Sequence, residues 1–330
     1  MTEQEYRKVE AVSYSMLSSF DKSLLGFKAR YIDGAEFQPS SYMNLGSAVD
    51  CMVTTPDEFK KTFKVVKREA LPTETIQKII DVVYQEVGGK DKLEDHGVVI
   101  VESAKSAEYQ GKWKDETIIN KIVTEGSEYF EILKIADDDT RRLINEDTYY
   151  EAVSIVQKLK DDPWTQWMFD PKEEIMFQVP ILWTETIDGK EVPFKALVDI
   201  MRKVDGVWRL YDLKVTDNVN GFLYVYKKLR YYIQSSLYRR GASMSTEIPV
   251  DDSHLTFITV DNSQKSPLMY RDENDCSIGI PRSPRQQNPI DGWTQIYNKM
   301  KWHKENDVWN HTKEAHENEG VILIPKLWSL

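Results

Sequence analysis

The stretch FKALVDIMRKVDGVWRLYDLKVTD, residues 194 to 217, constrains the fold of this chain more than any other segment. Two runs rich in Val, Ile, Leu, Trp and Tyr flank Asp205-Gly206, a pair that favours the positive φ angles of a two-residue type I′ turn. The stretch therefore predicts a β-hairpin whose register is set by its turn. Counting outward from the turn places Asp199 directly opposite Asp212.

Two facing carboxylates are unusual in a hairpin, because like charges about 5 Å apart across a strand pair should repel each other. Side chains alternate between the faces of a strand, so Lys214 projects to the same side as Asp199 and Asp212. A solvent-facing polar edge with a cross-strand ion pair is the ordinary interpretation of such residues. The register argues against that interpretation, because it places Lys214 opposite Leu197 and not opposite a carboxylate. A divalent cation such as Mg²⁺ would then convert the repulsion between the two Asp residues into coordination.

The composition is that of a globular chain, since 330 residues with 41% apolar and 11% aromatic content can form a substantial core. The net charge of −11 argues against wholesale coating of nucleic acid or of an anionic membrane, and it leaves room for a local basic channel. No segment approaches the length of a membrane span, and the polar start MTEQEYRKVE lacks the apolar core of a signal peptide. We therefore expect a cytoplasmic protein with no membrane partner. Cys51 and Cys276 match no zinc spacing and are expected to be reduced thiols.

Helical spacing of apolar residues marks the beginning of the chain. It predicts a first helix over residues 13 to 33, with Ser13 as its N-cap. A second helix is expected to begin near Leu45-Gly46 and to stop before Pro56.

Residues 75 to 160 are predicted to be mostly helical as well. Within them we expect a short apolar strand at residues 98 to 101 and an amphipathic helix from about Glu146 to Leu159. Residues 1 to 160 should therefore form a largely helical N-terminal portion.

The pattern changes at residue 174, where EIMFQVPILW and the two halves of the hairpin predict three successive strands. A helix at about 219 to 240 and a further strand at HLTFITV follow. This order predicts an α/β (α+β) fold, with the core sheet and helix in residues 174 to 260. Because no repeat or sharp change in composition marks a boundary, we expect residues 1 to 330 to form a single domain.

Asp-x-Lys on one strand, after a separate Asp on the neighbouring strand, resembles the arrangement of the PD-(D/E)xK nucleases. The resemblance implies that Asp199 and Asp212 hold Mg²⁺, that the carbonyl of Leu213 adds a ligand, and that Lys214 orients the attacking water. Such a site suits an anionic phosphodiester, because the metal polarises the phosphoryl oxygen and lowers the pKa of its water. Asp-x-Lys alone occurs by chance in many proteins.

An acidic residue ahead of the first Asp is also common in these nucleases. Glu174 is the candidate here, with Glu173 as its adjacent competitor. The alternative for either residue is a solvated charge at the end of a strand.

The helix after the hairpin carries Tyr231, Gln234 and Tyr238 at the spacing of one face, with Lys227 four residues before Tyr231. Aromatic stripes of this kind usually belong to a core. Q-x-x-x-Y after the Asp-x-Lys strand nevertheless resembles the RecB-like branch of these nucleases, in which it borders the active site. We therefore add Gln234 and Tyr238 to the catalytic residues. The DNA-binding candidates are Tyr231 and the basic residues around it, which would otherwise form a solvated helix face: Lys227, Lys228, Arg230, Arg239 and Arg240.

Over nearly its whole length the chain resembles the RecE-type (exodeoxyribonuclease VIII-like) exonucleases of phages and prophages. The blocks that carry this resemblance, in the expected order, are VSYSMLSSF, NLGSAVDCMVTTPDEF, EIMFQVPILW, KALVDIM, YDLKVTDNVNGF, YYIQSSLY, ITVDNSQKSPLMY and LIPKLW. The resemblance implies a PD-(D/E)xK nuclease core, that is, a central mixed β-sheet flanked by helices.

The activity implied is that of an exonuclease dependent on Mg²⁺, with Mn²⁺ as a substitute. It would degrade one strand of linear double-stranded DNA from the 5′ end and leave 3′ single-stranded tails. The implied partners are double-stranded DNA ends and a single-strand-annealing recombinase of the RecT type. The implied assembly is a homo-oligomeric ring, in the cytoplasm of a bacterial host if the chain is encoded by a phage.

The chain departs from the family pattern at Asp50, which stands where a metal-binding His is usual, and at Val198, which replaces the Pro before Asp199. Asp can donate an oxygen to Mg²⁺, so Asp50 is expected to be a metal ligand in a more anionic site. Two alternatives stay open at this point. One is a structure-selective or single-strand nuclease of the RecB-like branch, and the other is a catalytically decayed DNA-end-binding protein.

Overall fold

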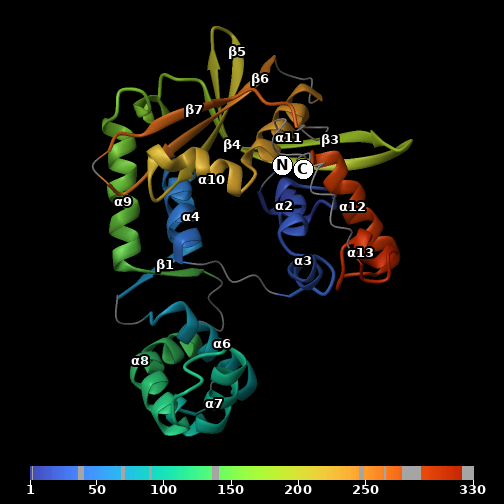
Figure 1. Cartoon of the computed structure of the whole chain (residues 1–330). Coiled ribbons are helices and arrows are strands. Elements are labelled where there is room, and N and C mark those ends of the chain that lie inside the picture. Colours follow the sequence, from blue (N-terminus) through green and yellow to red (C-terminus); the bar gives the residue numbers. More distant parts are fainter. Residues whose placement is uncertain are drawn as a thin grey trace. The chain divides into compact units, whose positions relative to one another are not determined.

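A computed structural model describes residues 1, 3–35, 41–67, 71–88, 91–135, 141–244, 249–263, 265–276 and 291–321 (Figure 1). The chain divides into two compact units, one made of Met1–Gln38 with Lys158–Leu330 and the other of Pro39–Gln157. The expectation of a single domain over residues 1 to 330 stays a prediction. In the described part of the chain, no helix combines the length and the apolar character needed to cross a bilayer.

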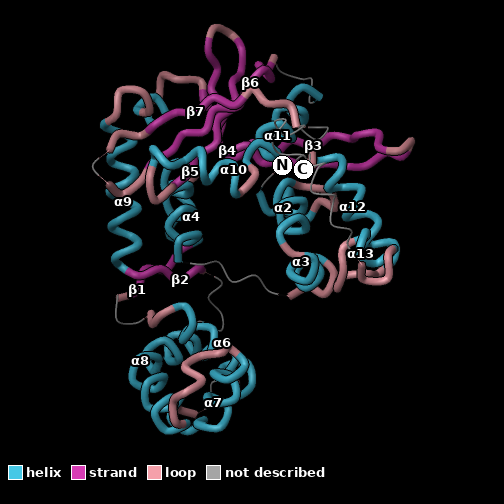
Figure 2. The backbone as a smooth tube through the Cα atoms, viewed as in Figure 1, coloured by secondary structure: helices cyan, strands magenta, loops and turns pink. Residues whose placement is uncertain are grey.

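The first unit is built on a five-stranded sheet of order β3-β4-β5-β6-β7 (Figure 2). Its strands are β3 Ile175–Ile187, β4 Lys190–Val204, β5 Val207–Val215, β6 Val250–Val260 and β7 Leu268–Asp272. The first three form an antiparallel meander, β6 is parallel to β5, and β7 is antiparallel to β6. The mixed sheet and the helices around it confirm the α+β class expected from the sequence.

Two consecutive helices cross from β5 to β6, namely α10 Phe222–Lys228 and α11 Tyr231–Met244, after the 3₁₀ turn Val219–Gly221. α11 packs on β3, β4 and β6. The remaining helices of this unit are α1 Glu3–Lys8, α2 Tyr14–Lys22, α3 Leu24–Tyr31, α12 Trp293–Asn306 and α13 Lys313–Glu317, with a 3₁₀ turn at Gln166–Phe169. Of these, α2 contacts both α11 and α12.

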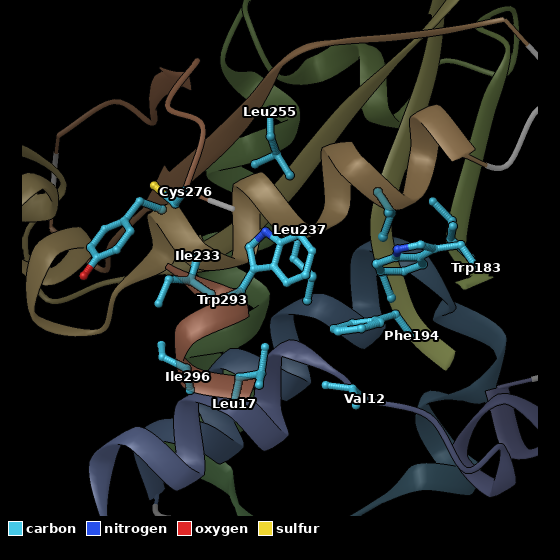
Figure 3. Packing of buried hydrophobic residues seen from close by; sticks show 14 of the residues in the cluster. Val12, Leu17, Trp183, Phe194, Ile233, Leu237, Leu255, Cys276, Trp293 and Ile296 are labelled. Atoms are coloured by element: carbon cyan, nitrogen blue, oxygen red, sulfur yellow. The ribbon is translucent and has the colours of Figure 1, made fainter. Parts of the chain in front are cut away.

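The core of this unit lies between α11, the β3–β4 pair and α2 with α12 (Figure 3). Phe194 and Leu237 are fully buried in it, and the Trp183 ring stacks on Phe194. A side chain at Gly241 would place its Cβ 2.6 Å from the Trp183 ring, so the close approach of α11 to β3 requires glycine there. Val12, just before α2, exchanges backbone hydrogen bonds with β4 and so ties the start of the chain to the sheet.

The second unit is mostly helical. Its elements are α4 Ser41–Thr54, a 3₁₀ turn Pro56–Glu58, α5 Phe59–Thr62, β1 Phe63–Val66, α6 Glu74–Val87, a 3₁₀ turn Leu93–His96, α7 Gly97–Ser106, α8 Asp115–Ile135 and β2 Arg142–Asn145. The helix α9, Glu146–Asp161, begins in this unit and continues beyond it. β1 and β2 form a two-stranded parallel sheet, and apolar residues of α6, α7 and α8 form a core of their own.

Several predicted boundaries are confirmed. Ser13 caps α2, since its hydroxyl accepts the Met16 N–H at 3.3 Å. α4 ends at Thr54 before Pro56 as predicted, although it begins at Ser41 and not near Leu45, and α9 begins at Glu146. The closing LIPKLW block of the family resemblance lies outside the described residues.

The strand predicted at residues 98 to 101 is wrong, because these residues belong to α7. Val98 is 74% exposed while Ile100, Val101 and Ala104 are buried, which is a helical burial pattern. A short apolar run fits a buried strand or a buried helix equally well, and only the residues after it extend it into a helix of 10 residues.

The predicted helices over 13 to 33 and 219 to 240 are each interrupted. Ser23 adopts an extended conformation and serves as C-cap of α2 and N-cap of α3. The break between α10 and α11 falls at Leu229 and Arg230, with Arg230 at a φ of 56°. Neither break contains Gly or Pro, the strongest signals for a helix end, although Ser23 is a residue type favoured at N-caps.

Candidate active site

The turn of the β4–β5 hairpin has the predicted geometry, with φ angles of 53° at Asp205 and 84° at Gly206. The predicted register also holds from Val204 opposite Val207 to Ile200 opposite Tyr211. The ladder ends there, one position before Asp199 and Asp212.

Beyond that point the two strands follow different neighbours. β4 continues along β3, with Val198 opposite Val179, while β5 continues along β6, with Asp212 opposite Phe257. Asp199 and Asp212 are therefore the first residues after the strands part, and they are not a ladder pair. This corrects the direct opposition expected from the turn.

Asp199 bridges the parting strands through its side chain. Its Oδ2 accepts the backbone N–H of Leu213 at 3.1 Å, which places a β4 carboxylate against the β5 backbone between Asp212 and Lys214. The first carboxylate of the candidate site is thus fixed by a main-chain donor.

Asp212 is almost completely buried, at 1% exposure. Oδ2 accepts a hydrogen bond from Gln234 Nε2 at 2.6 Å, and Oδ1 forms an ion pair with the Lys214 ammonium. Burial raises the pKa of Asp212 above its ordinary value, and the opposing influence of Lys214 and Gln234 does not cancel that effect.

Lys214 remains a cation in this environment. Burial by itself would lower the pKa of Lys214, but the Asp212 carboxylate, with Tyr231 and Asp199, outweighs burial and holds that pKa well above the usual value. The ammonium also lies 4.6 Å from the centroid of the Tyr231 ring, a cation–π contact. A lysine held protonated can stabilise negative charge and donate hydrogen bonds, but it cannot serve as a general base.

α11 contributes Gln234 and Tyr238, as the Q-x-x-x-Y pattern predicts. The Gln234 amide donates to Asp212, and its buried Oε1 has no hydrogen-bond partner in the described structure. Burial, and then the charges of Asp212 and Asp199, raise the pKa of Tyr238 well above its ordinary value, so this hydroxyl stays protonated beside the carboxylates. Lys227 belongs to α10, so it does not continue the α11 face as the uninterrupted helix predicted.

Glu173 and Glu174 lie away from this group. Glu173 accepts two hydrogen bonds of 2.8 Å from Arg202, and Glu174 pairs with Lys203 at 2.9 Å. Lys203 is four residues from Asp199 along β4, roughly 13 Å at the rise of a strand. The structure therefore does not bring Glu174 to the two Asp residues.

The expected basic cluster separates into two kinds of residue. Arg230 pairs with Asp21 at 2.7 Å, Arg239 donates to the carbonyls of Asp252 and Asn274, and Arg240 binds Glu185 through two nitrogens. These three arginines hold the fold together. Lys227 and Lys228 are exposed on α10, and Tyr231 is partly buried against Phe222 and Phe257.

Tyr14 also belongs to the site, although only the VSYSMLSSF block hinted at a role for its segment. It begins α2, and its hydroxyl donates to the Leu229 carbonyl at 2.9 Å, in the break between α10 and α11. Burial raises the pKa of Tyr14, while the Lys214 charge opposes that shift. Tyr14 and the Asp21–Arg230 pair thus attach α2 to the corner from which Tyr231 and Gln234 project. The sequence offers no signal for a contact between residues this far apart.

Asp50 lies on α4 in the Pro39–Gln157 unit, where its backbone carbonyl accepts the Thr54 hydroxyl at 2.9 Å. Its assignment as a metal ligand stays a prediction. Among the described residues, no group of three or more His, Cys, Asp or Glu side chains could hold a metal ion.

The donor set at the parting strands fits a hard cation. Asp199 and Asp212 supply two carboxylates, and Mg²⁺ is often held by one or two carboxylates with water and phosphate oxygens completing its shell. The buried Gln234 Oε1, which lacks a donor, could accept a hydrogen bond from a water molecule bound there.

Comparison with known protein-family models gives no match, and comparison with curated protein sequences gives none either. One solved structure that aligns with the chain is titled "Crystal structure of SSO0001". The alignment has 12% sequence identity and a TM-score of 0.27, and it covers 69% of this chain and 84% of the other. A likeness at this level supports no conclusion about fold family or function.

Proposed function

We propose that this chain is a metal-dependent nuclease that hydrolyses phosphodiester bonds of DNA. The observation that carries the proposal is the convergence of Asp199, Asp212, Lys214 and Gln234 at the point where β4 and β5 part. The residues come from two strands and a helix, and the hydrogen bonds among them fix the carboxylates before any substrate arrives.

Each side chain has a role in this proposal. Asp199 and Asp212 would hold Mg²⁺, or Mn²⁺ in its place, and the bound ion supplies Lewis-acid polarisation and an activated water. Lys214, protonated at neutral pH, would stabilise the negative charge that develops on the phosphate. Gln234 orients the Asp212 carboxylate through a 2.6 Å hydrogen bond.

The finer assignment to a PD-(D/E)xK core of the RecE type rests on the resemblance of the sequence. The order of three antiparallel strands, a helical crossover and a parallel strand agrees with it. On this basis we propose 5′ to 3′ action on linear duplex ends, in a cytoplasmic ring-shaped oligomer, that leaves 3′ tails for a RecT-type recombinase. Asp50 remains a predicted contributor, whereas Glu174 pairs with Lys203 and is not part of the proposed site.

Digestion of linear duplex, nicked circular and single-stranded DNA with Mg²⁺ tests the proposal. Exonuclease action shortens linear duplex and requires a free end, an endonuclease opens the intact strand of the circle, and a binding protein shifts DNA without shortening it. Asp199→Asn should abolish cleavage. Asp205→Asn is the matched control, since it removes the same charge from the same hairpin and keeps a turn sequence compatible with type I′. Equal activity in the two variants would refute the site.

A further inference from the structure

The short helix α10 has one buried face and one exposed face. Phe222 on the buried face packs on Phe257 and Tyr270, with ring centroids 5.5 and 5.0 Å apart. The Tyr226 hydroxyl donates to Asp272 on β7 at 2.8 Å. These contacts anchor α10 to β6 and β7, so the exposed face is held by the sheet.

The exposed face carries two adjacent large side chains, with Leu223 57% and Tyr224 70% exposed. One turn later it carries Lys227 and Lys228, both exposed. The Lys228 ammonium lies 5.9 Å from the centroid of the Tyr224 ring. Single exposed apolar residues are ordinary on a protein surface. Here an aromatic ring and an aliphatic side chain lie next to two cations, so apolar and positively charged groups are available to one ligand.

This surface is linked to the candidate active site by ring contacts. The Phe222 ring lies 6.0 Å from that of Tyr231, and the Tyr231 ring lies 4.6 Å from the Lys214 ammonium. The hydrogen bond from Tyr14 to the Leu229 carbonyl fixes the corner between the two helices. A ligand on the outer face of α10 would therefore be held at a set position relative to Lys214.

The ligand that matches this surface is a single strand of nucleic acid. Its bases present flat aromatic faces that stack on Tyr, and its phosphates complement lysine. The chain as a whole has a net charge of −11, so two adjacent exposed lysines beside an aromatic ring stand out as a local positive site. Such a site favours a polyanion over an apolar partner.

We propose that Tyr224 and Leu223 form a platform for an unpaired base of single-stranded DNA, while Lys227 and Lys228 contact its phosphates. The inference rests on the proposed nuclease function, because it takes the bound strand to be the substrate that continues to Lys214. It adds a preference for unpaired DNA that the carboxylate site does not require.

The test is equilibrium binding of a fluorescent oligonucleotide, single-stranded or in a duplex of equal length, with EDTA present so that no cleavage occurs. Tyr224→Ala should weaken single-strand binding about tenfold, in line with the stacking free energy of one base, and should affect the duplex much less. Tyr224→Phe, which keeps the ring, should stay within about twofold of wild type. Tyr224→Leu, which keeps apolar area but not the ring, should resemble Tyr224→Ala.

Tyr150→Ala is the matched control, because Tyr150 on α9 is 65% exposed but lies among Glu146, Asp147 and Glu151. Its binding should equal that of wild type. Unchanged single-strand binding by Tyr224→Ala, an equal loss for duplex and single strand, or no DNA binding by wild type would each overturn the inference.

These outcomes are independent of the outcome for the nuclease. If the wild-type protein binds DNA through Tyr224 but cleaves none, the proposed nuclease function is refuted and the inference about this surface stands. If the wild-type protein cleaves DNA but Tyr224→Ala does not change its DNA binding, the nuclease function stands and the inference about this surface is refuted.

Discussion

Asp212→Asn tests how the charges at the parting strands balance. The substitution preserves the shape of the side chain and removes a charge that is 1% exposed and paired with Lys214. Removing one partner of a buried ion pair costs about 3–5 kcal/mol, because the other charge stays buried without compensation. The Lys214 side chain keeps 18% exposure and can turn partly toward water, so we expect a loss near the lower limit, about 3 kcal/mol.

Urea unfolding followed by tryptophan fluorescence, in the presence of EDTA, measures this loss. The hairpin register alone makes the opposite prediction, since two facing carboxylates should repel and Asn should relieve the repulsion. An Asp212→Asn protein as stable as wild type, or more stable, would therefore refute the reasoning from the ion pair. The control is Asp205→Asn in the turn, which should unfold at the same urea concentration as wild type.

Three further predictions concern catalysis, pH and metal preference. Lys214→Ala should lower turnover by orders of magnitude with little change in DNA affinity. The double variant Lys227→Glu with Lys228→Glu should instead weaken DNA binding and flatten its salt dependence. Equal losses of DNA affinity in the two variants would contradict this distinction. Burial would raise the pKa of Asp261, but hydrogen bonds from Ser263 and Val219 outweigh it and place that pKa below its ordinary value. The stability from Asp261 is therefore present above the unfolded-state pKa and lost as pH falls through the folded-state pKa, so Asp261→Asn should destabilise more at pH 7 than at about pH 3 in urea unfolding. The family resemblance of Asp50 predicts severe impairment in Asp50→Ala and retained cleavage in Asp50→His, measured with Mg²⁺, Mn²⁺ and Co²⁺; full activity of Asp50→Ala would remove this residue from the site.

Local signals in the sequence predicted the hairpin well. Asp205-Gly206 fixes the turn through the φ angles it tolerates, and the turn fixes the nearby register. The end of the ladder could not be predicted in the same way. Beyond Ile200 and Tyr211, β4 stays paired with β3 and β5 stays paired with β6, and no residue of the turn specifies where the two strands separate.

The site residues also differ in whether local sequence signals predict them. Asp212 and Lys214 are two residues apart on one strand, and Gln234 follows on the next long helix, so a short pattern contains all three. Tyr14 reaches the site only because α2 packs on α11, and no periodicity reports such a contact. The place of Glu174 before β3 predicts a role in the site, but the structure pairs its carboxylate with the nearer charge of Lys203.

The proposed function gives the Asp212–Lys214 pair a catalytic role, and the energetics of buried ion pairs allow that role to be separated from a stabilising one. Desolvating two charges costs several kcal/mol per ion, and neutral side chains of similar volume often replace a buried pair without loss. The double variant Asp212→Asn with Lys214→Met should therefore recover most of the stability that Asp212→Asn alone loses, by about 2 kcal/mol, because no unpaired charge remains. On the proposed function it should nevertheless show no cleavage, since it lacks both one of the proposed carboxylate ligands and the cation proposed to stabilise the phosphate. Urea unfolding and DNA digestion of the same preparation separate the two roles. A double variant that unfolds as easily as Asp212→Asn would show that the pair stabilises the strands where they part, and the burial of two charges there would then need no catalytic explanation.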